Sequence, residues 1–194
     1  MQRANEQFGS CTFLEEKNVV RSVESEGTDG ILFRFCIKGE GFLRVDFRPV
    51  EDRKVALQLI LEERAEATVR LLCHGRKRST FTFRTLQRHV GNGSKSMVEV
   101  RCVCEDESRV DYCGKIEVPE HIVGVKVEQK NQNLLLSSRA CIHTEPAMDI
   151  RSKDVECFHG AAIGGIDPEV LRYFSMRGVE KSSAQELYIA GFLS

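Results

Sequence analysis

The sequence lacks the features that mark several large classes of protein. Its 28 basic and 29 acidic residues nearly cancel, so no charge excess indicates nucleic acid or an anionic membrane as a partner. No apolar run approaches the length of a membrane span, and the polar start, residues 1–7, has no secretory leader pattern. These absences predict a cytoplasmic protein with neither nucleic-acid nor membrane partners.

The common catalytic and phosphate-binding motifs are missing as well. There is no G-x-S-x-G and no H-E-x-x-H in the sequence. Residues 91–96 come closest to a phosphate loop, but Ser94 stands where a glycine must precede the lysine, and a strand pattern follows instead of a helix. We interpret this stretch as a hairpin turn and expect that the chain is not an enzyme.

Cysteine, in contrast, is abundant. Eight cysteines without a signal peptide favour a reducing compartment, where thiols serve as core residues, metal ligands or redox groups. The absence of C-x-x-C argues against a zinc ribbon or a thioredoxin-type site. Cys102 and Cys104 share one strand face and are explained as core residues, whereas Cys73 and His74 point to opposite faces and make a poor chelate.

Most of the chain alternates apolar and polar residues with the period of a β-strand. Such segments recur up to about residue 129, with Gly39, Gly41 and Pro49 as turn signals. Residues 54–62 fit a strand or a helix, and we favour a strand because an apolar run resumes at residues 68–73. The 194-residue chain is long enough for one mainly β domain: a sandwich, a jelly roll or a coiled parallel β-structure. No consensus repeat chooses among them.

The pattern changes from strand to helix at residue 167. Asp167 and Pro168 predict an N-cap and a first helical position, and Gly178 predicts the end of that helix. Ser182 or Ser183 can cap a second helix.

We therefore expect helix only between residues 167 and 193. The chain divides into a β core over residues 1–166, with irregular N-terminal strands over 1–50, and a helical segment over 167–194.

Two Cys-x-His pairs precede this helical segment. Cys141 and His143 form the first pair, and Cys157 and His159 repeat the same spacing further along the chain. Because residues i and i+2 of a strand share a face, each pair places a thiol beside an imidazole. If one turn of a coiled chain is as long as the separation of the two pairs, they stack into a patch suited to zinc or iron. The alternative is that the thiols are small buried hydrophobic groups. A small-residue turn is expected over residues 160–165.

The stretch around the second pair resembles the C-terminal signature of the SufB/SufD family, scaffold components of iron–sulfur cluster assembly. The resemblance lies in residues 154–164 (DVECFHGAAIG), 171–179 (LRYFSMRGV) and 184–192, with residues 133–137 and 144–150 upstream. It is specific from about Gln129 to Phe192, and the His-Gly-Ala sequence is closer to the SufD-like branch.

This resemblance implies a parallel β-helix core with a short α-helical tail. It also implies a non-catalytic scaffold that works as a homodimer or heterodimer with a SufB/SufD-like subunit and binds a SufC-like ABC ATPase through its tail. The tail residues expected to bind that partner are Leu171, Phe174, Leu187, Tyr188 and Phe192. Compared with the family, the chain looks like a minimal member.

The resemblance places a functional histidine of SufD-like proteins at His159. The group handled would be a transient iron–sulfur cluster, which the purified protein need not retain. A gap-free count puts the SufB-like cysteine at Asn131, so a thiolate would come from Cys157, Cys141 or a second subunit, and His143 matches a SufB-like histidine. A second hypothesis from another class is a metal-dependent, cupin-like β-fold enzyme with Cys and His ligands.

Overall fold

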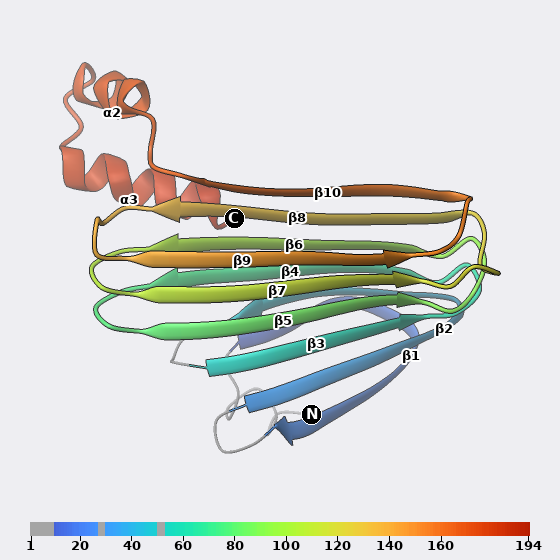
Figure 1. Cartoon of the computed structure of the whole chain (residues 1–194). Helices are drawn as coiled ribbons and strands as arrows, with labels where there is room; N and C mark the ends of the chain where they lie inside the picture. The colour runs from blue at the N-terminus through green and yellow to red at the C-terminus, as the bar shows by residue number, and fades with distance from the viewer. Residues whose placement is uncertain (1–9, 27–29, 50–52) are drawn as a thin grey trace.

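The computed structural model describes residues 10–26, 30–49 and 53–194 and is dominated by β-structure (Figure 1). Its strands wind into a parallel β-solenoid of about four turns, followed by two short helices, which confirms the predicted β-helix. The elements are, in chain order, β1 (Ser10–Glu26), β2 (Gly30–Arg48), β3 (Arg53–Leu61), β4 (Glu66–Gly75), β5 (Thr80–His89), β6 (Lys95–Cys104), β7 (Arg109–Val118), β8 (Val125–Leu135), β9 (Cys141–Ile150), β10 (Val155–Gly164), α2 (Pro168–Ser175) and α3 (Lys181–Phe192).

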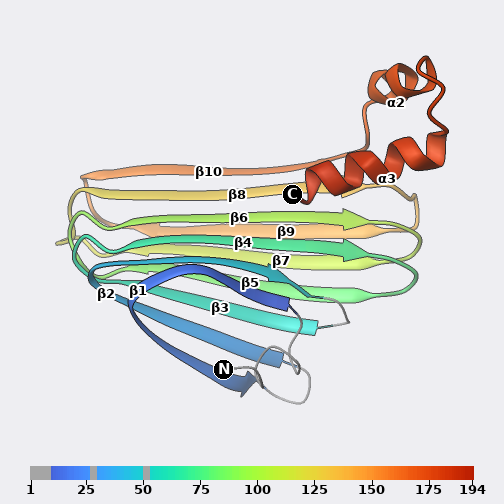
Figure 2. The same ribbon diagram turned by 180° about the vertical axis from the view of Figure 1, so that it is seen from behind.

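The described strands form one continuous sheet that folds back on itself. Their order is β10-β8-β6-β4-β2-β3-β5-β7-β9, with β1 antiparallel to β2. The long strand β2 turns the corner, because its first half pairs with β3 and its second half with β4. From β3 onward, even-numbered strands therefore make one wall and odd-numbered strands the opposite wall, as the front and back views show (Figures 1 and 2).

Successive turns of this solenoid lengthen along the chain while their strands stay in parallel register. Aligned residues of neighbouring turns lie 24 residues apart in the first turn and 28 to 32 apart in the later ones, as between Gly30 and Lys54 and between Val155 and Val125. Aligned positions of parallel strands face the same side of the sheet. Inward-facing residues thus stack on inward-facing residues of the next turn, and each turn needs its neighbours to bury its interior face.

The interior is mostly apolar, with Phe35, Phe83 and Val100 at most 1% exposed. It also contains a column of buried polar side chains, centred on His89. The ring nitrogens of His89 lie 2.7 Å from the Ser94 hydroxyl and 2.9 Å from the Ser96 hydroxyl. Burial lowers the pKa of His89 to about 4, so this histidine is neutral at physiological pH.

Two sequence interpretations of turns are wrong. Gly39 and Gly41 lie inside β2, where Glu40, with a φ of 48°, helps to bend the strand around the corner instead of ending it. Residues 91–94 do form a turn, but the strands on either side of it, β5 and β6, pair with β3 and β4 and not with each other. It is therefore a crossing between the two walls and not a hairpin.

The remaining local predictions have mixed outcomes. Residues 53–61 form strand β3, so the helical alternative is excluded. The Asp167 carboxylate accepts a hydrogen bond from the backbone N–H of Glu169 at 2.9 Å, which confirms the N-cap. The serine cap of the second helix is wrong, because α3 begins at Lys181 and its N-cap residue, Glu180, makes no side-chain capping bond.

The two helices contact the body unequally. Ile189 of α3 packs on Val103 and Leu134 at the end of the even-numbered wall, and the Arg101 guanidinium donates to the Phe192 carbonyl at 2.8 Å. No residue of α2 is buried, and this helix stands away from the solenoid (Figure 2). Within the described residues, no helix is both long and apolar enough to span a membrane.

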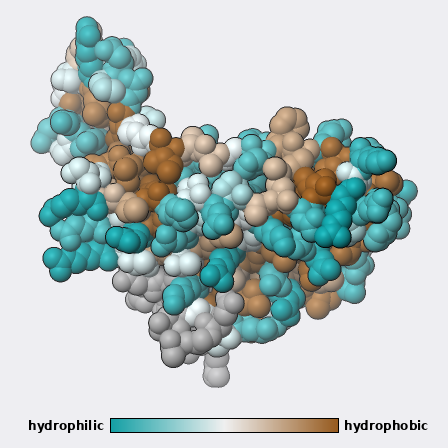
Figure 3. Space-filling model, in the orientation of Figure 1, coloured by the Kyte–Doolittle hydropathy of each residue, from teal (hydrophilic) through white to brown (hydrophobic). Residues whose placement is uncertain are grey.

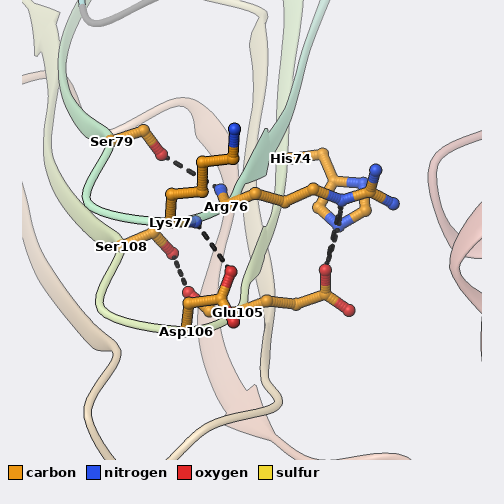
Figure 4. Close-up of polar contacts among 7 residues, drawn as sticks. All are labelled: His74, Arg76, Lys77, Ser79, Glu105, Asp106 and Ser108. Atoms are coloured by element: carbon orange, nitrogen blue, oxygen red, sulfur yellow. Dashed lines mark hydrogen bonds and ion pairs between the residues drawn. The ribbon is translucent and has the colours of Figure 1, made fainter.

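Charged corners join successive turns at one side of the solenoid. The Arg76 guanidinium contacts both the His74 imidazole, at 3.3 Å, and the Glu105 carboxylate, at 3.2 Å, and His74 itself lies 3.1 Å from Glu105 (Figure 4). The backbone N–H of Lys77 donates to Asp106 at 2.8 Å. These groups satisfy one another between turns, so we interpret the cluster as a structural link and not as a site. Exposed pairs of this kind contribute roughly 0–1 kcal/mol each.

Candidate functional site

The last turn of the solenoid, formed by β9 and β10, is open on one side. In the described part of the chain, β10 pairs only with β8 and β9 only with β7. Inward-facing positions that would be buried in an earlier turn are therefore accessible here. Met148 is 52% exposed and Ile163 is 49% exposed, although their aligned partners, Ile116 and Asn133, are almost fully buried.

Cys157 faces the interior at this open end. It is aligned with the buried Val127 and packs against the apolar cluster that contains Ile116. Its thiol lies 3.7 Å from the sulfur of Met148, on the opposite strand of the same turn. Partial burial raises the pKa of the Cys157 thiol above its ordinary value. The thiol is thus protonated in the isolated chain and can donate to the thioether.

His159 occupies the next inward-facing position of β10. It is aligned with Gln129, which is 1% exposed and whose side-chain oxygen lies 3.5 Å from the amide nitrogen of Gln87. Gln87 in turn accepts a hydrogen bond from Ser96, a neighbour of His89. His159 therefore continues a buried polar column to the surface, and it is itself exposed.

The two Cys-x-His pairs do not come together. Cys141 and His143 are aligned with Arg109 and Asp111 and face outward from β9, whereas Cys157 and His159 face inward from β10. The expectation of a shared patch is wrong because one turn of the solenoid is nearly twice as long as the separation of the pairs. They therefore fall on opposite walls of the same turn. In the described residues, no group of three His, Cys, Asp or Glu side chains is placed to hold a metal ion.

The small residues after His159 belong to the strand. The expected turn over residues 160–165 is wrong, because β10 continues to Gly164. A Cβ atom added at Gly160 or at Gly164 would meet nothing within 4 Å. The second half of this edge strand therefore has little side-chain bulk, because Gly160 and Gly164 have no side chain and those of Ala161 and Ala162 are small.

Asn131, the position of the SufB-like cysteine, is buried in the interior below Ala161. Its side-chain oxygen accepts a hydrogen bond from the Asn133 amide at 2.7 Å. The Asn131 amide nitrogen and the Asn133 amide oxygen have no protein partner. At the open end of the interior, Cys157 is the thiol of this chain that faces inward, whereas Cys141 faces outward from β9.

The five tail residues divide into two groups. Tyr188 and Phe192 pack on the cluster that attaches α3 to the sheet. Leu187 is 56% exposed, and Leu171 and Phe174 of α2 are half-buried. Figure 3 shows apolar surface where the helical arm meets the body. The surface available to a partner is thus centred on α2 and Leu187.

Met148 is the site residue that sequence reasoning missed. It precedes Cys157 by about one strand length in the chain, and no motif marks it. The position of the corner between β9 and β10 is the signal that could have identified Met148. Residues 151–154 form that corner, and Met148 and Cys157 lie at equal distances before and after it, so they face each other.

Comparison of the sequence with known proteins identifies its family. The model of the SufBD core domain, from the SUF system of FeS cluster assembly, matches residues 53–192. The chain is 34% identical over 92 residues to the iron–sulfur cluster assembly protein SufD of Escherichia coli, which covers 47% of this chain and 22% of that protein. It is 30% identical over 139 residues to the SufBD family protein slr0076 of Synechocystis, covering 70% of this chain and 30% of that protein.

A third relative, SufD of Bacillus subtilis, is 31% identical over 120 residues, or 62% of this chain and 28% of that protein. The chain thus spans less than a third of the length of these relatives. The matched region includes the open turn and both helices, and the family model covers well over half of the chain. The chain therefore belongs to the SufBD family of iron–sulfur cluster assembly proteins.

Proposed function

We propose that this chain is a non-catalytic scaffold in iron–sulfur cluster assembly. The observation that carries the proposal is the open last turn, where Cys157 and His159 face an uncovered interior beside a bare edge strand. A thiol and an imidazole are suitable ligands for iron. A transient cluster, as the cargo of the complex, would be held between this mouth and a second subunit.

The second subunit would pair along the edges of β9 and β10. An exposed strand presents unpaired backbone N–H and C=O groups that template pairing with another chain. The bare half of β10, residues 160–164, lets another backbone approach closely. The partner would be a second copy or another SufB/SufD-like subunit. It would supply further ligands, since the described residues of one chain offer no complete metal site.

A SufC-like ABC ATPase would dock on the helical arm. The exposed apolar residues there are Tyr173, Met176 and Leu187, at 52%, 76% and 56% exposed. Amphipathic helices with such faces are a recurrent mode of partner binding. ATP hydrolysis would then belong to the partner, because the 91–96 loop lacks phosphate-binding spacing. All eight cysteines are free thiols, which favours the cytoplasm as the location.

The cupin-like alternative receives no support from the fold. Cupins are double-sheet jelly rolls with antiparallel strands, whereas the described strands from β2 to β10 stack in parallel.

The cluster site is tested with His159→Ala and, separately, Cys157→Ser. Each variant is co-expressed anaerobically with the ATPase and the second subunit, and iron and sulfide are measured in the purified complex. Both are expected to lower cluster content, while His143→Ala, on the outward face of β9, is the matched control. Parental iron and sulfide in both variants would refute the site.

The ATPase surface is tested with Phe174→Asp and Leu187→Asp. Both side chains lie on the helical arm and outside the cluster that attaches α3 to the sheet, so the solenoid is expected to stay folded. Co-purification of the ATPase is expected to be lost. Undiminished ATPase binding by the folded double variant would exclude the arm as its docking surface.

A further inference from the structure

Two sulfur atoms meet inside the open end of the solenoid. The Cys157 Sγ lies 3.7 Å from the Met148 Sδ, across the interior of the last turn. Met148 is aligned with Ile116 and Cys157 with Val127, and both of these partners are buried. The sulfurs therefore occupy inward-facing positions and are still reachable from solvent, because Met148 is 52% exposed.

An imidazole lies on the same face of β10 as the Cys157 thiol. His159 follows Cys157 by two positions in β10, so both side chains lie on the same face of the strand, with their Cα atoms roughly 6–7 Å apart. A thiol, a thioether and an imidazole thus border one opening. Both strands are held by continuous parallel pairing to the turn below, which fixes the backbone of all three residues.

These ligand types discriminate among metals. Thiolate and thioether sulfurs are soft ligands that favour Cu(I), and imidazole also binds copper, whereas Mg²⁺ and Ca²⁺ require oxygen ligands. The neighbouring carboxylates do not supply oxygens to the opening. Asp149 and Glu156 alternate to the outer face, where they pair with Arg151 at 3.0 Å and with Lys126 at 2.9 Å. A structural zinc site would need four ligands.

We propose that Met148, Cys157 and His159 bind a soft monovalent cation, Cu(I), at the open end of the solenoid. A Cu–S bond forms at Cys157 as the thiol proton leaves to solvent, and the oxidation state of copper does not change. The consequence rests on the proposed function: Cys157 and His159 also belong to the proposed cluster site, so bound Cu(I) competes with a nascent cluster. Met148 serves the copper site alone.

The test titrates the purified full chain with Cu(I) anaerobically, in competition with the chromogenic chelator bicinchoninate and with ascorbate as the reductant. The parent is expected to take one Cu(I) ion per chain from the chelator. Cys157→Ser is expected to abolish this uptake. Met148→Leu, which keeps the size of the side chain, is expected to weaken affinity at least about tenfold, the scale on which even supporting residues affect metal sites.

Cys141→Ser is the matched control. Cys141 is an exposed thiol in the other Cys-x-His pair, but it faces outward. Its replacement is expected to leave Cu(I) uptake unchanged, which separates the site from binding at any exposed thiol. X-ray absorption at the copper edge gives a second readout, because the sulfur scattering per copper falls in Met148→Leu. Equal affinity of the parent and Met148→Leu, or equal loss in Cys141→Ser, overturns the proposal.

Failure of this inference and failure of the cluster scaffold give different results. If Met148→Leu loses Cu(I) affinity but keeps parental iron and sulfide in the co-expressed complex, the copper site is supported as a distinct property. A parent chain that takes no Cu(I) from the chelator refutes the copper site alone. Parental cluster content in Cys157→Ser and His159→Ala refutes the cluster site alone, and the titration still stands.

Discussion

The two ends of the solenoid are finished in different ways. At the N-terminal end, β1 runs antiparallel along β2, carries several charged residues and has two register shifts. At the C-terminal end, β9 and β10 follow their neighbours without a register shift, and the second half of β10 consists of uncharged, mostly small residues. Charges and bulges protect edge strands from pairing with other chains. The described N-terminal edge thus carries protective features that the second half of β10 lacks, which supports the proposal that a second subunit pairs there.

The comparison extends to packing. Each inner turn is covered on both sides, so its inward-facing residues are buried, whereas the inward-facing residues of the last turn are half-exposed. Repeat proteins need terminal caps for solubility. The half-exposed inward-facing residues of the last turn bury little surface within this chain, and under the proposed function a second subunit would cover them.

The largest expected difference is between two phenylalanines. Phe83 is fully buried at the centre, and Phe158 is 67% exposed on the last turn. Phe83→Ala is expected to lower the free energy of unfolding by about 3–5 kcal/mol because it leaves a cavity. Phe158→Ala is expected to change it by less than about 0.5 kcal/mol. Urea denaturation of both variants measures this, and equal losses would contradict the distinction between the closed interior and the outer face of the last turn, where Phe158 is aligned with the outward-facing Glu128.

The closed interior is also expected to be sensitive to acid. Burial holds the pKa of His89 at about 4, below its ordinary value of 6.5, so the unfolded chain takes up the proton first as pH falls. The free energy of unfolding is then undiminished above pH 6.5 and decreases toward pH 4, by roughly 1.4 kcal/mol per pH unit. Denaturation curves between pH 7 and 4 measure this slope. His89→Gln is expected to flatten it, and an unchanged slope would exclude His89 as its source.

Two glycines sharpen the comparison between the ends. A Cβ atom at Gly41, near the N-terminal end, would lie 2.6 Å from the Lys38 carbonyl oxygen and 2.7 Å from that of Lys17. Gly41→Ala is therefore expected to cost about 1–3 kcal/mol of stability through overpacking. Gly160→Ala, with nothing within 4 Å of the new atom, is expected to be neutral within about 0.5 kcal/mol. Thermal unfolding of the two variants distinguishes these outcomes, and a costly Gly160→Ala would show that the edge is not open.

The smallest effect concerns association and not folding. Ala161→Glu places a charge on the inward face of the exposed edge, and it is expected to weaken pairing with a second SufB/SufD-like subunit at least about tenfold, or about 1.4 kcal/mol. Val20→Glu, at a 59% exposed position of β1, is the control at the N-terminal end and is expected to leave association unchanged. Sedimentation velocity measures both. Equal association of Ala161→Glu and the parent would place the interface elsewhere.

The sequence predicted which segments form strands and helices better than it predicted which strands pair with each other. Period-2 alternation marks strands because it reflects the two faces of each strand, and the N-cap at Asp167 is a local signal that the structure confirms. Pairing in a parallel solenoid joins residues a full turn apart in the chain, and nothing in a single strand records that distance. The predictions of a hairpin at residues 91–96 and of stacking between the two Cys-x-His pairs failed for this reason.

The candidate site was predicted in part. Two residues on the same strand, Cys157 and His159, were correctly expected to share a face because strand geometry alone determines this. Which face is inward, and which end of the solenoid is open, depend on all the turns together. Met148 escaped notice because its contact with Cys157 crosses the interior from the opposite wall. The role of the arm in partner binding stays a prediction, and two of its five residues, Tyr188 and Phe192, also pack on the cluster that attaches α3.

The corners of the solenoid have a consequence for how such chains change in length. The step from β7 to β9 takes more residues than the step from β3 to β5, and the ladders of both pairs remain continuous. The corner between β7 and β8 holds residues 119–124, against 62–65 between β3 and β4, and the corner before β9 holds 136–140, against 76–79 before β5, so the corners take up most of the extra length. Each turn thus consists of paired strands in fixed register that are joined by corners of variable length. A chain of this kind can therefore hold extra residues at its corners while the register of its paired strands is kept.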